Sequence, residues 1–166
     1  KILCGGVSKY QGKDFNTFTL NNREISFAEG CCILVKSQVF EKVGLLDEKY
    51  FMYFEEVDFS LKVLPHYKIL FVSSSIIYHK SGAGQRWNSY SPLYYYYYTR
   101  NRFYLFSRFR KTFKIYVLAF STLNFLHKSL VLYYYYLISS KEKKTKLKQS
   151  MKSLYNGFRD GLRNFF

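Results

Sequence analysis

The sequence predicts an α/β domain followed by basic, aromatic α-helices. Three observations lead to this prediction: a continuous apolar run at residues 30–35, an amphipathic segment that ends at Pro65, and a change of composition after residue 88. A continuous apolar run suits a strand buried on both faces, whereas an apolar period of about 3.6 residues suits a helix. We therefore expect an α/β part at residues 1–88 and a helical part at residues 89–166.

Charge separates these two parts of the chain. Residues 1–99 carry eleven Lys and Arg against nine Asp and Glu, a net charge of +2, whereas residues 100–166 carry fifteen against two, a net charge of +13. The formal charge of +15 therefore belongs mainly to the C-terminal part. The length of 166 residues is enough for one core of ordinary size, with or without an appendage.

The three cysteines, Cys4, Cys31 and Cys32, have neither the spacing of a zinc site nor that of a disulfide framework. We expect Cys31 and Cys32 to alternate across a strand as small buried residues in a reducing compartment. The N-terminus does not have the pattern of a signal peptide and does not begin with methionine, so we expect the chain to be part of a longer protein.

Local patterns predict the elements of the first part. A short helix at residues 38–43 should end at Gly44, a residue that favours the end of a helix. The next helix should begin at or soon after Asp47 and end at Pro65, because proline interrupts a helix. A strand should follow at residues 68–72 and 76–78, broken or bent at the three serines between them.

The C-terminal part should be helical and should bind a membrane surface. Pro92 follows Ser91, and proline is favoured in the first turn of a helix. Residues 113–139 are long enough to cross about 30 Å as a helix, but His127 and Lys128 at its centre would cost several kcal/mol inside a bilayer. Together with the tyrosine runs and the lysine-rich segment 141–148, this favours peripheral attachment over a membrane span or a soluble dimerisation arm.

Three carboxylates lie in a segment that is otherwise aromatic or apolar: those of Glu55, Glu56 and Asp58. Buried acids are costly unless they form pairs, bind a metal or transfer protons. About twenty residues later, His79 opens a glycine-rich loop. This order of acids, histidine and loop indicates half of an active site, but solvated helix acids and a hydrogen-bonded histidine would give the same pattern.

Four stretches of sequence resemble the C-terminal half of the catalytic domain of a family 2 inverting glycosyltransferase. They are Gly30, Val-Gly-Leu-Leu-Asp-Glu at 43–48, Phe-Met-Tyr-Phe-Glu-Glu-Val-Asp at 51–58, and Tyr-His-Lys at 78–80. The similarity extends over residues 1–111 and is greatest to the rhamnosyltransferase-like group that builds bacterial surface polysaccharides. It implies the C-terminal, acceptor-side portion of a GT-A-like, Rossmann-related domain.

The resemblance also implies roles for individual residues. Glu56 would be the general base that takes a proton from the acceptor hydroxyl, at a position where most relatives have Asp, and Glu55 would support it. Asp58 would orient the acceptor or form an ion pair with Lys62, four residues later on the helix. His79 matches the family's metal-ligating histidine and would complete a Mg²⁺ or Mn²⁺ site.

The loop after His79 would bind the donor, a nucleotide-diphosphate sugar. Lys80 and Arg86 would offset the charge of the diphosphate, and Trp87 would stack on a sugar or fill a core. The family's nucleotide pocket and Asp-x-Asp motif precede this region and do not occur in the sequence. The chain alone is therefore expected to be inactive and to contribute the acceptor half of a site, for a glycan or lipid-linked acceptor.

Two other classes of function remain open. A catalytically inactive scaffold in a polysaccharide assembly complex would explain Glu in place of Asp and the missing donor half. A module that binds single-stranded nucleic acid would explain basic residues between aromatic ones. Because the basic residues lie among long apolar runs, an anionic membrane at the cytoplasmic face, contacted by residues 94–166, is the favoured partner, and a second copy of the chain is a further one.

Overall fold

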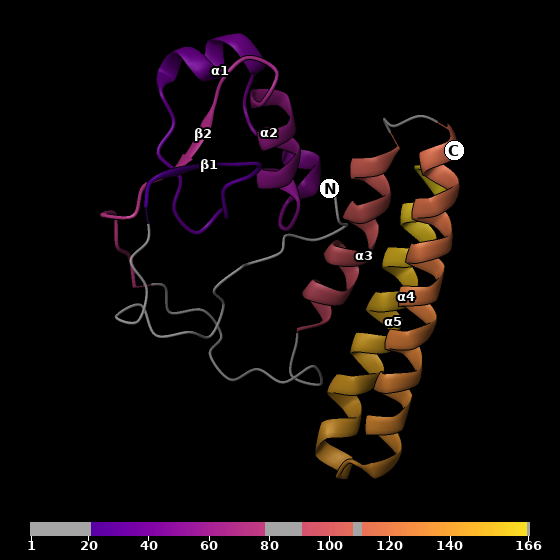
Figure 1. Ribbon diagram of the computed structural model, residues 1–166. Coiled ribbons are helices and arrows are strands. Elements are labelled where there is room, and N and C mark those ends of the chain that lie inside the picture. Colours follow the sequence, from indigo (N-terminus) through magenta and orange to yellow (C-terminus); the bar gives the residue numbers. More distant parts are fainter. Residues whose placement is uncertain (1–20, 79–90, 108–110, 166) are drawn as a thin grey trace. The chain divides into compact units, whose positions relative to one another are not determined.

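The computed structural model describes residues 21–78, 91–107 and 111–165, which form two compact units (Figure 1). The first unit comprises Lys1–Glu48 and Glu55–Lys80, and the second comprises Lys49–Phe54 and Ser81–Phe166. Each unit has a core of its own.

The first unit combines a small sheet with two short helices. Strands β1 (Arg23–Ile25) and β2 (Ile69–Phe71) pair antiparallel, with Glu24 opposite Leu70. Helix α1 spans Ser37–Val43 and helix α2 spans Glu55–Val63. A short 3₁₀ helix at Glu48–Tyr50 precedes α2 along the chain.

The core of the first unit lies between α1 and α2. Val39 of α1 and Phe59 and Val63 of α2 are buried, and the rings of Phe40 and Phe59 are 5.4 Å apart. Gly44 ends α1 with φ of 80°, a conformation that glycine adopts without strain. The prediction of a short helix that ends at Gly44 is therefore confirmed.

One predicted strand of the first unit is wrong, and another is confirmed in part. Residues 30–35 form a turn and a loop in which Cys31, Cys32 and Leu34 are exposed, and Cys4 lies outside the described residues. A continuous apolar run is buried only where strands flank it, and in the described part β1 and β2 pair with each other. The strand expected at 68–72 is present as β2, and it ends before the serines, where the backbone N–H of Ser73 donates to Asn22 Oδ1 at 2.9 Å. Residues 76–78, expected to continue it, form no strand.

The described residues of the second unit form three long helices: α3 (Pro92–Phe106), α4 (Lys111–Ile138) and α5 (Lys141–Arg163). Helix α3 begins as predicted, since Ser91 Oγ accepts a hydrogen bond from the backbone N–H of Tyr94 at 3.2 Å. A link of two residues joins α4 to α5, so these helices run antiparallel and side by side (Figure 1).

Helices α3 and α5 pack closely because two glycines of α5 face α3. A Cβ added to Gly157 would lie 2.4 Å from the carbonyl oxygen of Tyr96, and one added to Gly161 would lie 2.4 Å from Phe103 Cδ2. Phe103 is fully buried and its ring contacts Phe165 with centroids 5.4 Å apart. The close approach of the two backbones therefore depends on the missing side chains.

The fold-class prediction is met in part. The expected basic, aromatic helices after residue 88 are present as α3, α4 and α5. The part before them is less regular than predicted: among residues 21–78 the structure has only short helices and one two-stranded sheet. The described residues are therefore mostly helical and do not display the larger sheet of a Rossmann-related domain.

Candidate functional site

The acid pair opens helix α2 in the first unit. Glu55 and Glu56 occupy its first two positions and are both half-buried. The first turn of a helix has unpaired N–H groups and a positive dipole end, which favour carboxylates there. Gly30 lies close to the pair, because a Cβ added to it would be 3.8 Å from Glu56 Cβ and 3.9 Å from Glu55 Oε1. The sequence motif around Gly30 and the acid pair thus meet in one place.

The surroundings of Glu56 raise the pKa of its carboxyl group above the ordinary value of 4.5. Burial is the largest cause, and the neighbouring negative charges of Glu55 and Glu29 add to it, while a backbone hydrogen bond acts in the opposite direction. Glu55 Oε2 is itself buried and has no hydrogen-bond partner among the described residues. A carboxylate with a raised pKa is a stronger base, which suits it to accept a proton.

Asp58 lies one turn further along α2 and is 4% exposed. Its Oδ2 is 2.7 Å from Lys62 Nζ, so the ion pair considered from the sequence is present. Ser60, also in α2, accepts a hydrogen bond on its Oγ from the backbone N–H of Ala28 at 3.4 Å. The hydrogen bond between Ala28 and Ser60 therefore joins the loop before Gly30 to α2.

The residues that precede the acid pair have an unusual backbone. Phe51, Tyr53 and Phe54 have φ angles of 62°, 66° and 74°. Aromatic residues rarely adopt the left-handed region, and each such residue costs about 1–3 kcal/mol unless its surroundings hold it. The segment Lys49–Phe54 belongs to the second unit, where α3 supplies the contacts that hold it.

Asn101 of α3 supplies most of those contacts and was not identified from the sequence. Its side chain is fully buried, and its Nδ2 donates to the carbonyl oxygens of Tyr50, Met52 and Tyr53 at 2.8, 2.7 and 2.9 Å. Arg100 donates from Nε to Asn101 Oδ1 at 2.8 Å and from Nη2 to the carbonyl oxygen of Tyr50 at 3.2 Å. The only signal in the sequence was an amide in the middle of an aromatic helix.

The predicted donor-side residues His79, Lys80, Arg86 and Trp87 lie outside the described residues. Within residues 21–78, 91–107 and 111–165, no group of three or more His, Cys, Asp or Glu could hold a metal ion. The acids of α2 therefore do not form a Mg²⁺ or Mn²⁺ site by themselves.

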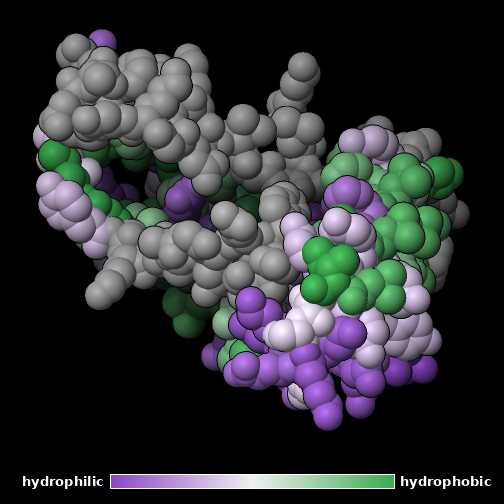
Figure 2. Space-filling model, turned by 90° about the horizontal axis from the view of Figure 1, so that it is seen from below, coloured by the Kyte–Doolittle hydropathy of each residue, from purple (hydrophilic) through white to green (hydrophobic). Residues whose placement is uncertain are grey.

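Helix α4 presents an apolar face to the outside of its unit. Phe113–Ile138 is long and apolar enough to cross a membrane, but a core helix of a soluble protein passes the same test of length and composition. One side of α4 carries large exposed side chains: Ile115, Tyr116, Leu123, Leu126, Leu130, Tyr133, Tyr134, Leu137 and Ile138. Lys128 lies on the opposite side and is buried. Helix α5 follows and carries exposed lysines. Figure 2 shows hydrophobic residues (green) and hydrophilic residues (purple) in separate areas of the unit's surface.

Comparison with known proteins finds short similarities to glycosyltransferases. A low-salt glycan biosynthesis hexosyltransferase, Agl10, from Haloferax volcanii is 41% identical over 39 residues, which cover 24% of this chain and 13% of that protein. The N-acetylglucosaminyl-diphospho-decaprenol L-rhamnosyltransferase of Mycobacterium tuberculosis, in two strains, is 33% identical over 63 residues, or 37% of this chain and 20% of that protein.

The chain thus spans no more than about a fifth of the length of these relatives. No protein-family profile matches the chain, and no solved structure matches it. The chain therefore shares short stretches of sequence with enzymes that are named as a hexosyltransferase and a rhamnosyltransferase.

Proposed function

We propose that the chain is the acceptor-side part of an inverting glycosyltransferase of cell-surface polysaccharide synthesis, with a GT-A-like fold in its first part. Glu56 is the residue on which this proposal depends. Its half-buried position at the start of α2 and the raised pKa of its carboxyl group suit a general base. The partial similarity to a hexosyltransferase and a rhamnosyltransferase supports the same class of reaction.

In the proposed reaction, Glu56 accepts the proton of an acceptor hydroxyl. The acceptor oxygen then forms a bond to the anomeric carbon of the donor sugar, while the bond from that carbon to the nucleoside diphosphate breaks on the opposite face. The configuration at the anomeric carbon is therefore inverted. Glu55 contributes by its negative charge, which raises the pKa of its neighbour and so strengthens the base.

The donor side of the proposal rests on residues outside the described ranges. Lys80 and Arg86 would balance the charge of the diphosphate, Trp87 would contact a sugar, and His79 would ligate Mg²⁺ or Mn²⁺. Because the described acids do not form a metal site by themselves, no step of the proposed reaction is assigned to the ion.

We place the protein peripherally on the cytoplasmic face of the cell membrane. The exposed apolar side of α4 would enter the boundary between headgroups and acyl chains, and the lysines of α5 would contact anionic headgroups. Each lysine near an anionic surface contributes about 1 kcal/mol. A lipid-linked acceptor would be available at the same surface.

The test is a transfer assay with a panel of nucleotide sugars, a lipid-linked acceptor and Mg²⁺ or Mn²⁺, on the protein with its natural flanking sequence. Glu56→Gln keeps the size of the side chain but removes the base, so turnover should fall while acceptor binding is kept. Glu41→Gln is the matched control, since Glu41 is an exposed glutamate of α1. His79→Ala tests the metal ligand. If folded protein transferred no sugar, or if Glu56→Gln matched Glu41→Gln, the scaffold function would replace this proposal.

A further inference from the structure

Two aromatic residues of the second unit have a strained backbone and yet remain exposed. Phe51 and Tyr53 have φ angles of 62° and 66°, in the left-handed region, and they are 67% and 36% exposed. Tyr50 and Phe54, in the same segment, are buried. Packing in a core therefore explains why Tyr50 and Phe54 are aromatic, but it does not explain why Phe51 and Tyr53 are.

Other residues would fit this backbone at a lower cost. Glycine adopts the left-handed region readily, and asparagine does so more often than most residues that have a side chain. Either residue would follow the same backbone without presenting a ring, but the sequence has Phe51 and Tyr53 there. Strained backbone of this kind occurs at ligand clamps, where it holds a side chain ready for its ligand. The two rings are therefore candidates for a binding role.

Tyrosines of α3 support both rings. The Phe51 ring packs on Tyr97 with centroids 4.9 Å apart. The Tyr53 ring stands edge-on to Tyr94 and Tyr98, at 5.4 and 6.0 Å. The three tyrosines lie within one turn on one side of α3, because residues three and four positions apart are neighbours on a helix. Both exposed rings therefore lie over the same stretch of this helix.

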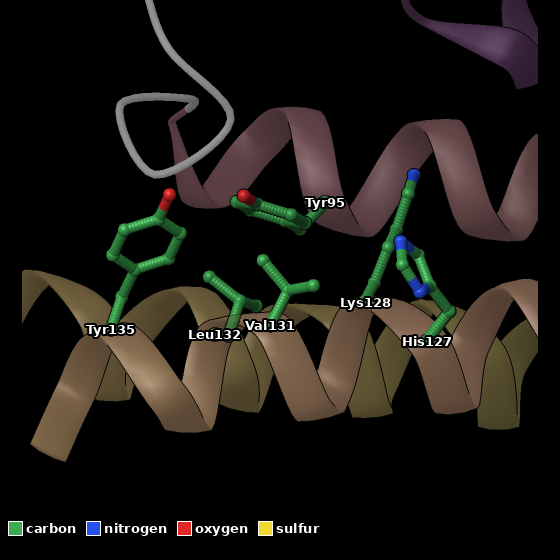
Figure 3. A pocket seen from close by; sticks show the side chains of 6 residues that line it. All are labelled: Tyr95, His127, Lys128, Val131, Leu132 and Tyr135. Carbon is green, nitrogen blue, oxygen red and sulfur yellow. The ribbon is translucent and has the colours of Figure 1, made fainter.

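This support is itself held in place. Asn101 binds the carbonyl oxygen of Tyr53 at 2.9 Å. Lys128 Nζ lies 5.1 Å from the ring centroid of Tyr94 and 4.6 Å from that of Tyr98, and Figure 3 shows its side chain extending from α4 towards α3. Contacts between a buried ammonium group and aromatic rings are attractive. The rings therefore have a fixed arrangement before any ligand binds, which lowers the entropic cost of binding.

The chain itself keeps these rings near the proposed base. Tyr53 and Phe51 precede Glu56 by three and five positions. Because an extended chain spans at most about 3.6 Å per residue, their Cα atoms lie within about 11 and 18 Å of that of Glu56. A short oligosaccharide with one hydroxyl group at Glu56 can therefore reach the rings with its next sugar units.

A sugar unit suits exposed aromatic rings chemically. One face of a pyranose carries mainly C–H groups, which pack on the face of an aromatic ring, while the hydroxyl groups at its edge stay in water. The cavity in Figure 3, of about 170 Å³, suits a sugar less well, because its mainly apolar lining would leave most hydroxyl groups without hydrogen bonds. The residues that line this cavity are Tyr95, His127, Lys128, Val131, Leu132 and Tyr135.

We propose that Phe51 and Tyr53 bind a sugar unit of the acceptor glycan by packing their rings against its C–H face, with Phe51 as the principal contact. The inference rests on the proposed function, which makes the bound glycan the acceptor of the transfer. The bound unit follows the one whose hydroxyl group gives its proton to Glu56. The two rings thus favour acceptors that extend beyond the reacting sugar unit.

The first test is the binding of soluble glycans, which requires no transfer. Methyl glycosides and short oligosaccharides of glucose, mannose, galactose, rhamnose and N-acetylglucosamine are titrated into the full chain, and dissociation constants are measured by NMR. Phe51→Asn suits the left-handed backbone but removes the ring, so it should weaken binding of the preferred glycan on the order of tenfold. Tyr53→Asn should weaken it as well.

Tyr155→Asn is the matched control, because Tyr155 of α5 is also an exposed aromatic residue, and it should bind like the parent. If the parent bound none of these glycans, or if Phe51→Asn bound them as Tyr155→Asn does, the proposal would be overturned. Loss of liposome flotation in Phe51→Asn, with glycan binding kept, would also overturn it, because the ring would then contact the membrane.

The second test is the transfer assay, in which Phe51→Asn should raise the KM for the acceptor about tenfold and leave kcat near that of the parent. Glu56→Gln should instead lower kcat, because it removes the base. An active Phe51→Asn protein with unchanged KM would contradict the role of the rings alone. A folded parent that binds glycans through Phe51 but transfers no sugar would contradict the proposed function and would keep the rings as a glycan-binding site.

Discussion

The side-chain amide of Asn101 donates a hydrogen bond to the carbonyl oxygen of Tyr50, at 2.8 Å and across 51 positions of sequence. The same nitrogen reaches the carbonyl oxygens of Met52 and Tyr53. Three carbonyl oxygens thus converge on one amide group in the segment where Phe51, Tyr53 and Phe54 have positive φ. The strained backbone before the acid pair persists because α3 holds its carbonyl groups.

Asn101→Asp should destabilise the helical unit by roughly 3 kcal/mol or more, because it replaces the donors by a carboxylate that faces carbonyl oxygens in a buried place. Urea unfolding followed by circular dichroism measures the loss. Asn164→Asp is the control, since Asn164 is exposed and its side-chain amide donates to one carbonyl oxygen, that of Asp160. Equal effects of the two substitutions would contradict this role for Asn101.

Gly157→Ala should separate α3 from α5. The added methyl group would lie 2.4 Å from the carbonyl oxygen of Tyr96, and backbone cannot move aside as a flexible side chain can. Overpacking of this kind costs roughly 1–3 kcal/mol. The change should appear as a lower midpoint of unfolding, whereas Lys152→Ala, on an exposed position of α5, should leave the midpoint nearly unchanged. If the Gly157→Ala protein were as stable as the parent, α3 and α5 would be packed less closely than the structure has them.

The raised pKa of Glu56 predicts how activity depends on pH on the acidic side of its profile, the acid limb. A general base acts only when deprotonated, so kcat/KM should rise with pH through the pKa of this carboxyl group, above the ordinary 4.5. Because the charge of Glu55 is one cause of the shift, Glu55→Gln should move the limb to lower pH. A limb that stays in place in Glu55→Gln would assign the titration to another group.

The apolar side of α4 predicts a difference between two aspartate substitutions. Leu130 of α4 is 70% exposed and Leu70 of β2 is 60% exposed, so neither substitution disturbs a core. Leu130→Asp should reduce flotation with liposomes of phosphatidylcholine and phosphatidylglycerol about tenfold, because it removes an apolar side chain from the membrane and would place a charge there. Leu70→Asp should float like the parent. If the two substituted proteins floated alike, the prediction that this side of α4 binds the membrane would be wrong.

Features that depend on a few neighbouring residues could be predicted from the sequence. Ser91 and Pro92 specify the start of α3 because a cap and a fixed φ act locally, and Gly44 ends α1 for a similar reason. Residues 30–35 were predicted wrongly because burial of a strand depends on neighbours elsewhere in the chain. An apolar run therefore indicates a strand only when its partner strands are known.

In the candidate site, too, local sequence identifies some residues, whereas others come together only in the folded chain. The pattern of acids identified Glu56, but the sequence gives no indication that Glu29, from a distant loop, adds to its pKa shift. Asn101 and Arg100 could not be identified, because their partners lie about fifty positions earlier. Lys128 was noticed only as an obstacle to a membrane span, and its cavity depends on how α3 packs on α4.

The buried Lys128 predicts a pH dependence of stability. Its pKa is lowered from 10.5 to about 7 in the folded protein, by burial and by Arg102, while His127 and the rings of Tyr94, Tyr95, Tyr98 and Tyr135 are its other titratable neighbours. Between pH 7 and 10.5 the unfolded chain binds more protons than the folded one, so the free energy of unfolding rises with pH. The cost of holding the charged lysine in this buried place, roughly 5 kcal/mol, falls in full on the folded protein only below pH 7.

Lys128→Met removes this titration. The substituted protein should be more stable than the parent at pH 7, and the difference should shrink by roughly 2 kcal/mol between pH 7 and pH 9. Unfolding by urea at a series of pH values measures both quantities, and Lys152→Met, on the exposed part of α5, should leave the parent's pH dependence intact. A parent whose stability did not vary with pH relative to Lys128→Met would show that the lysine keeps its ordinary pKa.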